Sequence, residues 1–244
     1  MKTALVTGAS RGIGRGIATS LAQQRYGLTL TSRSSDDLAI LANELLILGA
    51  ADVIHQRADL ADRDALPGLV ELHGSRFTSM DALVVNAGVG TGGKVVDYPL
   101  GRLDKTIEVN FTSAVVLIQR AIPLLRQAAK DDPRFGAKVI GLSSIAGVHA
   151  EAGLAVYGAS KAALLSLIET VNLEESPHGI TATAIAPAYV ETDMSAWVTD
   201  KVSADTMIPV SDVVAVVDML LGLTSNTSIT KIVMSRSGTT GYSA

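Results

Sequence analysis

The chain has 244 residues, of which 48% are hydrophobic and 18% are charged, and its formal net charge is −4. This composition is that of a globular protein, and the length suits one α/β domain. The acidic balance offers no surface for a polyanion, so nucleic acid is not an expected partner. The chain lacks cysteine, and its four histidines (His55, His73, His149 and His178) show no metal-ligand spacing, so neither thiolate chemistry nor a metal site is expected.

The sequence carries no recognisable targeting or membrane segment. The apolar part of the N-terminal stretch MKTALVTGAS is too short for a signal peptide. No apolar run approaches the roughly 20 residues that a membrane helix needs, and Asp218 interrupts the most apolar stretch near the C-terminus. We therefore expect a cytoplasmic protein with no membrane partner.

Short apolar runs alternate along the chain with segments whose apolar residues recur every three or four positions. The apolar runs predict strands at 3–7, 27–32, 52–57, 82–88, 137–144, 180–186 and 228–234. The periodic segments predict helices at 12–25, 35–48, 62–73, 103–129, 156–175 and 212–223. Strands without polar alternation indicate a parallel sheet covered on both faces. The sequence thus predicts a single α/β domain over residues 1–244, a doubly wound parallel sheet of about seven strands.

The first predicted strand ends in the glycine-rich stretch TGASRGIG, residues 7–14. Glycines at positions 8, 12 and 14 permit a tight turn and let backbone N–H groups approach a pyrophosphate at a helix N-terminus. The alternative is an ordinary turn between a strand and a helix. The glycine-rich stretch lies between the first strand and an amphipathic helix, and this position favours a nucleotide site. A nucleotide site there in turn predicts a sheet of the Rossmann type.

The second predicted strand ends with Arg33, and no carboxylate occurs before Asp36. An acidic residue at this point would hold the adenosine ribose hydroxyls and favour NAD. Arg33, together with Ser10 and Arg11, is instead suited to a 2′-phosphate, which predicts a preference for NADP over NAD. The alternative for Arg33 is a solvated surface residue.

Tyr157 and Lys161 lie one helical turn apart in a predicted helix. A fixed ammonium stabilises a phenolate, so we expect Lys161 to lower the pKa of the phenol by about two to three units, roughly 3–4 kcal/mol. That change would suit a general acid–base group. The alternative is a packed tyrosine beside a lysine that extends to solvent.

Taken together, TGASRGIG at 7–14, NAG at 86–88, Asn110, Ser144 and YGASK at 157–161 resemble the short-chain dehydrogenase/reductase family, closest to the bacterial 3-oxoacyl-[acyl-carrier-protein] reductase group. The resemblance implies that Tyr157 exchanges the proton while Lys161 lowers its pKa. It implies that Ser144 binds the substrate oxygen, with Ser143 as the competing choice, and that Asn110 holds a water in a proton relay.

The same resemblance implies a set of cofactor-binding residues, which are Gly8, Ser10, Arg11, Gly12, Ile13, Gly14, Arg33, Asp59, Leu60, Asn86, Ala87, Gly88, Tyr157, Lys161, Pro187, Val190 and Thr192. By sequence alone, Asp59 could equally be a helix cap, and Asn110 could bend or cap a helix. The implied activity is hydride transfer between NADP(H) and a carbonyl or secondary alcohol, and the narrower version is 3-oxoacyl thioester reduction. The alternative is a non-catalytic nucleotide-binding sensor or scaffold.

Some segments depart from the family pattern or vary within it. Pro187 is followed by Ala188 where the family has glycine, and the C-terminal end lacks its Asp-Gly-Gly. Residues 193–210 correspond to the substrate lid, where apolar side chains suit an apolar ligand or simple loop packing. The lid candidates are Met194, Trp197 and Met207, and the loop candidates for substrate contact are His149, Glu151 and Leu154.

The helices predicted at 103–129 and 156–175 are rich in alanine, valine, leucine and isoleucine. Their apolar surface exceeds what one sheet face can cover. In the family these helices pair across a two-fold axis, so the resemblance implies a homodimer or homotetramer.

Overall fold

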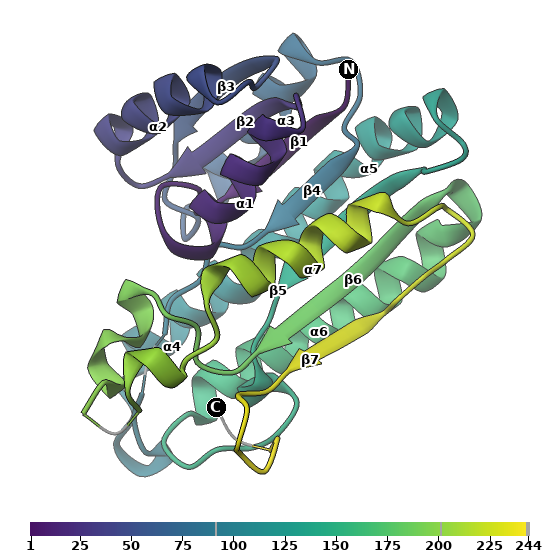
Figure 1. The fold of residues 1–244 in the computed structure, drawn as a ribbon. Coiled ribbons are helices and arrows are strands. Elements are labelled where there is room, and N and C mark those ends of the chain that lie inside the picture. The colour runs from purple at the N-terminus through teal and green to yellow at the C-terminus, as the bar shows by residue number, and fades with distance from the viewer. Residues whose placement is uncertain (91, 201, 243–244) are drawn as a thin grey trace.

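The computed structural model describes residues 1–90, 92–200 and 202–242; the expected domain and lid ranges therefore include residues 91, 201, 243 and 244, which lie outside it. The described residues form a seven-stranded sheet in the order β3-β2-β1-β4-β5-β6-β7, and every neighbouring pair is parallel (Figure 1). The strands are β1 (Thr3–Thr7), β2 (Gly27–Ser32), β3 (Asp52–Arg57), β4 (Ala82–Val85), β5 (Ala137–Leu142), β6 (Ile180–Pro187) and β7 (Lys231–Met234). The predicted doubly wound fold is confirmed.

Helices cover both faces of the sheet (Figure 1). They are α1 (Gly12–Gln23), α2 (Ser35–Ile47), α3 (Leu66–Arg76), α4 (Leu100–Ile107), α5 (Ser113–Asp131), α6 (Ala155–Glu175) and α7 (Val210–Gly222). One core lies under α1, α2 and α7, and the other lies under α3, α5 and α6. The middle strands are buried on both sides, which explains why they read as unbroken apolar runs.

The long helical segment differs from its prediction. It starts earlier, at Leu100, and a π-helical stretch, Glu108–Thr112, joins α4 to α5. By length and composition alone, Leu100–Asp131 could cross a membrane, a test that the core helix of a soluble protein also passes. Here Ala114, Leu117 and Leu125 on α5 are fully buried in the core beneath the sheet.

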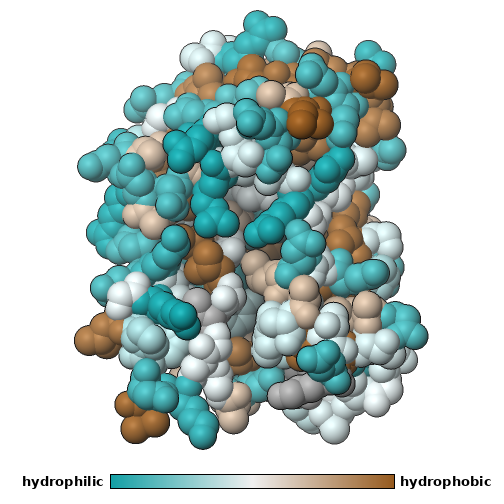
Figure 2. All heavy atoms as spheres, turned by 90° about the vertical axis from the view of Figure 1, so that its left-hand side faces the viewer, coloured by the Kyte–Doolittle hydropathy of each residue, from teal (hydrophilic) through white to brown (hydrophobic). Residues whose placement is uncertain are grey.

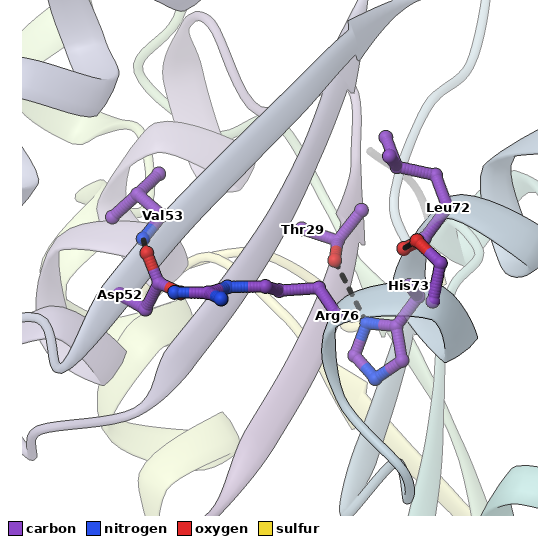
Figure 3. A network of polar contacts seen from close by, with 7 residues as sticks. Thr29, Asp52, Val53, Leu72, His73 and Arg76 are labelled. Atoms are coloured by element: carbon purple, nitrogen blue, oxygen red, sulfur yellow. Dashed lines mark hydrogen bonds and ion pairs between the residues drawn. The ribbon is translucent and has the colours of Figure 1, made fainter.

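At the N-terminal end of the strands, α3 carries a fully buried histidine, His73 (Figure 3). Its Nδ1 lies 2.8 Å from the Thr29 hydroxyl, and its Nε2 lies 3.1 Å from the Ser79 carbonyl oxygen. Nearby on the same helix, Arg76 reaches the Asp52 carboxylate at the start of β3. Burial lowers the pKa of His73 to about 4, so this histidine is a neutral part of the core.

The strand order reverses between β1 and β4, because β1 pairs with β2 on one side and with β4 on the other. In open α/β sheets, ligands bind beyond the carboxyl ends of the strands at such a switch point. All the strands point their carboxyl ends to the same edge, so the predicted site residues must converge there.

Candidate active site

The glycine turn lies directly after β1 and begins α1. Gly8 and Gly12 have positive φ of 63° and 53°, a conformation that side chains with a Cβ rarely adopt. A Cβ on Gly14 would lie 2.3 Å from the Gly8 carbonyl oxygen, so this position must lack a side chain. The turn leaves the backbone N–H groups of the first helical turn open to the cleft, as an anion requires.

Asn86 ties the glycine turn to the end of β4. Its side-chain amide donates hydrogen bonds to the Thr7 and Gly8 carbonyl oxygens, at 2.9 and 3.2 Å. The Thr7 hydroxyl in turn accepts from the backbone N–H groups of Asn86 and Ala87. The two loops at the switch point are therefore fixed to one another, and the NAG motif has a structural role beside any contact with a cofactor.

The two serines after β5 have different environments. The Ser143 hydroxyl donates to the Lys161 backbone carbonyl at 2.8 Å and so anchors α6. The Ser144 hydroxyl caps the short helical turn Ile145–Gly147, and it lies close enough to the Tyr157 phenol to oppose the rise in the pKa of that phenol. Of the two alternatives left open by the sequence, Ser144 is the serine whose side chain meets Tyr157.

Close packing brings Ser144 and Tyr157 together. A Cβ on Gly158 would lie 2.6 Å from the Ala146 carbonyl oxygen, so the turn after Ser144 can rest on α6 only because residue 158 is glycine. Sequence reasoning gave Gly158 no role. The signal available was its place inside the YGASK motif, next to the tyrosine.

Tyr157 and Lys161 come together on α6 as predicted, but the pKa of the phenol moves in the opposite direction. Burial raises the pKa of Tyr157 above 10, and the Ser144 hydrogen bond only partly offsets this. The Lys161 ammonium lies 5.9 Å from the centre of the phenol ring, donates to the Leu142 carbonyl at 2.8 Å, and is itself buried. Burial lowers the pKa of Lys161 to about 8. The expected lowering at Tyr157 is therefore wrong for this structure, because burial disfavours the charged phenolate and outweighs the opposing effect of the Ser144 hydroxyl.

Asn110 lies in the π-helical stretch and is buried. Its side chain accepts from Val89 N at 2.8 Å and donates to the Val89 carbonyl and the Ser160 hydroxyl, both at 3.0 Å. These bonds use both amide hydrogens, so the side chain holds the loop after β4 against α6. A water relay through Asn110 must use its remaining oxygen lone pair or its backbone carbonyl.

A cleft of about 760 Å³ runs across the carboxyl ends of the strands. Seen from this side, the molecule is hollowed between largely hydrophilic rims (Figure 2). All the residues predicted for the cofactor line it except Gly14, which is buried at the start of α1. Three of the four predicted catalytic residues, Ser144, Tyr157 and Lys161, line it as well. Asn110 lies behind its wall, since its carboxamide oxygen and the Lys161 ammonium both approach Gly88.

At the adenosine end of the expected cofactor site, the cleft meets β2 and the loop after β3. The Asp59 carboxylate accepts from Ala61 N at 3.1 Å and closes a turn, while the short helix that follows is capped by Asp62. The helix-cap alternative for Asp59 is therefore wrong. Thr31 also lines the cleft, and its fully buried hydroxyl has no partner in the described residues. Sequence reasoning did not single out Thr31.

The lid residues divide into two groups. Met194 and Trp197 line the cleft and are 46% and 63% exposed, whereas Met207 is buried away from it and packs inside the protein. Of the two alternatives for Met207, the structure shows loop packing and not contact with a ligand. Tyr189, which was not predicted, lies in the wall with its ring 6.1 Å from that of Trp197.

The departures from the family pattern are accommodated locally. Ala188 is buried, donates to the Met234 carbonyl at 2.8 Å and keeps a negative φ, so the loop does not require glycine here. The C-terminal end returns to the same region, where Tyr242 meets His149 edge-on at 5.0 Å and Arg236 lies 6.0 Å from the Tyr189 ring. Of the loop candidates, Leu154 lines the cleft.

Comparison with known proteins agrees with this geometry. The chain is 34% identical over 213 residues to the 3-oxoacyl-[acyl-carrier-protein] reductase FabG of Staphylococcus aureus, covering 86% of this chain and 84% of that protein. It is 31% identical over 194 residues to the D-beta-hydroxybutyrate dehydrogenase of Rhizobium meliloti, covering 79% and 73%.

Two solved structures share the fold over almost their whole length. The RhlG/NADP active-site complex of Pseudomonas aeruginosa has a TM-score of 0.86 at 29% identity, covering 96% of this chain and 94% of that chain. A short-chain dehydrogenase of Burkholderia cenocepacia in complex with NADP has a TM-score of 0.85 at 29% identity, covering 97% and 96%. The model of the short chain dehydrogenase family matches residues 2–203, and the chain belongs to this family of oxidoreductases.

Proposed function

We propose that this protein is an NADP(H)-dependent oxidoreductase that interconverts a carbonyl compound and a secondary alcohol. The observation that carries the proposal is that the Tyr157 phenol, the Ser144 hydroxyl and the buried Lys161 ammonium converge in the same cleft as the glycine turn. A non-catalytic nucleotide-binding protein on this fold would have no use for these three groups at one point, so we favour an enzyme.

The residues present fit NADP(H). The glycine turn offers open backbone N–H groups, and Arg33 stands exposed at the end of β2, where an acidic residue would select NAD. The Thr31 hydroxyl is buried at the cleft without a protein partner, as expected of a group whose partner is a ligand. When bound, NADP(H) supplies or accepts the hydride.

Tyr157 is the proton donor in the direction of carbonyl reduction. Because burial raises its pKa above 10, the phenol keeps its proton at neutral pH. As the substrate oxygen gains alkoxide character it becomes far more basic than a phenolate, and transfer from the phenol is then favourable. The Lys161 ammonium, held by the Leu142 carbonyl, provides a nearby positive charge for the phenolate that remains.

Ser144 and Asn110 support this step from two sides. The Ser144 hydroxyl lies next to the Tyr157 phenol and is placed to donate to the same substrate oxygen and to stabilise its developing charge. Asn110 fixes the loop after β4 through Val89 and meets α6 through Ser160, so we assign it a positioning role together with a place in the proton relay.

The substrate end of the cleft favours an apolar carbonyl compound. Its walls include Leu154, Tyr189, Met194 and Trp197, which combine aliphatic, thioether and aromatic surface. Among such compounds we place 3-oxoacyl thioesters first, because the Staphylococcus aureus relative is a 3-oxoacyl-[acyl-carrier-protein] reductase. Short 3-oxo acids come second, on the similarity to D-beta-hydroxybutyrate dehydrogenase. A panel of both classes, followed by NADPH absorbance, distinguishes them.

The central test removes one oxygen atom. Tyr157→Phe should lower kcat about 10²–10⁴-fold while the Kd for NADPH stays within a few-fold, because the phenol acts on the substrate oxygen. Tyr26→Phe is the matched control, since Tyr26 is buried near Asp81 and Asp218 and does not line the cleft. Wild-type turnover by Tyr157→Phe would refute the mechanism.

The same proposal includes assembly and compartment. Leu173 on α6 is 76% exposed, an apolar side chain that pairing of α6 with a second copy would cover. We propose a cytoplasmic homodimer or homotetramer formed through the helices at 103–129 and 156–175. Light scattering that gives the mass of one chain at micromolar concentration would contradict this assembly.

A further inference from the structure

The side chain of Arg57, at the end of β3, reaches the backbone of Arg33, which follows β2 and lines the cleft. Ser32 and Arg57 are paired residues in the parallel ladder, which brings Arg57 beside Arg33. The Arg57 Nε donates a hydrogen bond to the Arg33 backbone carbonyl at 3.0 Å. This bond holds the Arg57 side chain against the backbone just after β2, next to a residue that lines the cleft.

Neither guanidinium is neutralised by a carboxylate. In the described part of the chain, Arg33 and Arg57 form no ion pair, and both are exposed. An anion within reach of both guanidiniums would be stabilised by two positive charges. The backbone bond uses only Nε, so the terminal nitrogens of Arg57 remain available as donors.

Charged groups around Arg33 decide whether an anion can bind here. The N-terminus of α2 starts at the same point, with Ser34 as its cap, and its partial positive charge adds to that of the two arginines. Asp36 and Asp37 in the first turn of α2 oppose this, and Asp37 lines the cleft. Arg33 alone would face two negative charges, whereas Arg33 and Arg57 together balance them, so that the partial positive charge of the helix N-terminus leaves the site slightly positive.

We infer that Arg57 is a second determinant of cofactor choice, which contacts the 2′-phosphate of NADP(H) together with Arg33. The inference rests on the proposed function and adds to it a residue from β3. Arg33 lines the cleft, and Arg57 lies outside the lining but is hydrogen-bonded to the Arg33 backbone. The phosphate would therefore be bound by residues from the ends of two neighbouring strands. Arg57 has no other charged partner in the described residues to account for its position.

The test measures binding and does not depend on turnover. Titration calorimetry with adenosine 2′,5′-bisphosphate and with AMP separates the contribution of the 2′-phosphate, and NADPH and NADH fluorescence repeats the comparison with whole cofactors. Arg57→Gln should weaken the bisphosphate and NADPH about 10-fold or more while changing AMP and NADH less than 2-fold. Arg57→Lys keeps the charge but loses the fixed planar geometry, and it should restore only part of the affinity.

Arg76→Gln is the matched control. It makes the same chemical change and removes the same charge, but Arg76 lies on α3 at the opposite end of the sheet, paired with Asp52 (Figure 3). Its Kd for the bisphosphate should equal that of the wild type. An equal loss for AMP and the bisphosphate in Arg57→Gln, or no loss for either, would overturn the assignment of Arg57. If the wild type itself did not prefer the bisphosphate, the NADP(H) assignment would fail instead, so the two failures are distinguishable.

Discussion

Lowering the pH from 7 to 4 should remove a defined part of the stability of this protein through one side chain, His73. The imidazole is fully buried between β2 and α3, and its pKa falls from an ordinary 6.5 to about 4 because burial disfavours the charged form. The unfolded chain therefore takes up a proton at a higher pH than the folded protein. The contribution of His73 to the free energy of unfolding is complete above pH 6.5 and is lost as the pH falls towards 4. The free energy of unfolding therefore falls by about 3 kcal/mol over this range because of His73.

The assay is urea unfolding followed by circular dichroism at pH 7, 6, 5 and 4, at one protein concentration. Carboxylates also titrate in this range, so the informative quantity is the difference in pH dependence between the wild type and His73→Gln. The variant lacks the titrating ring, and its loss of stability between pH 7 and 4 should be smaller by about 3 kcal/mol. His55→Gln, at an exposed histidine of β3, should keep the wild-type slope. Parallel curves for wild type and His73→Gln would refute the reasoning.

Two further substitutions test packing. Lys138 on β5 is buried, its ammonium has no hydrogen-bond partner in the described residues, and burial lowers its pKa to about 8. Lys138→Met should stabilise the protein by about 1–3 kcal/mol at pH 7. The gain should shrink at pH 10, where the folded-state amine is neutral and the unfolded-state amine, whose ordinary pKa is 10.5, has begun to lose its proton. Thermal melts at both pH values would show this change, and an equal gain at both would contradict it. Gly158→Ala places a Cβ 2.6 Å from the Ala146 carbonyl and must shift Ser144 relative to Tyr157. We expect kcat to fall up to about 100-fold with little change in the Kd for NADPH, whereas Gly222→Ala, which meets nothing within 4 Å, should leave both unchanged.

The strand and helix pattern of this chain could be predicted because it is local. A central parallel strand is buried on both faces, and a surface helix on one, so each element shows its own periodicity in the sequence. The predictions are wrong where contacts with other elements change the local backbone or side-chain conformation. The helix at 103–129 looked uniform, yet it contains a π-helical stretch at Asn110, whose side chain bonds to Val89 and Ser160 on other elements.

The site shows the same division. The glycine turn, the Arg33 position and the spacing of Tyr157 and Lys161 follow from residue type and chain order, since a positive φ or one helical turn is a property of a few adjacent residues. Contacts between segments far apart in sequence decide which of the two adjacent serines lies next to Tyr157. Such contacts also decide that Met207 is buried away from the cleft.

The sequence by itself determined the fold class and the residue types that line the cleft, because backbone preference and hydrophobic period are encoded within single elements. Only the tertiary structure decided the sign of the Tyr157 pKa change and the pairing of Arg57 with Arg33. Desolvation depends on everything packed around a group, and a contact between parallel strands depends on their register. Neither desolvation nor strand register can be read from the residues adjacent in the chain to the group concerned.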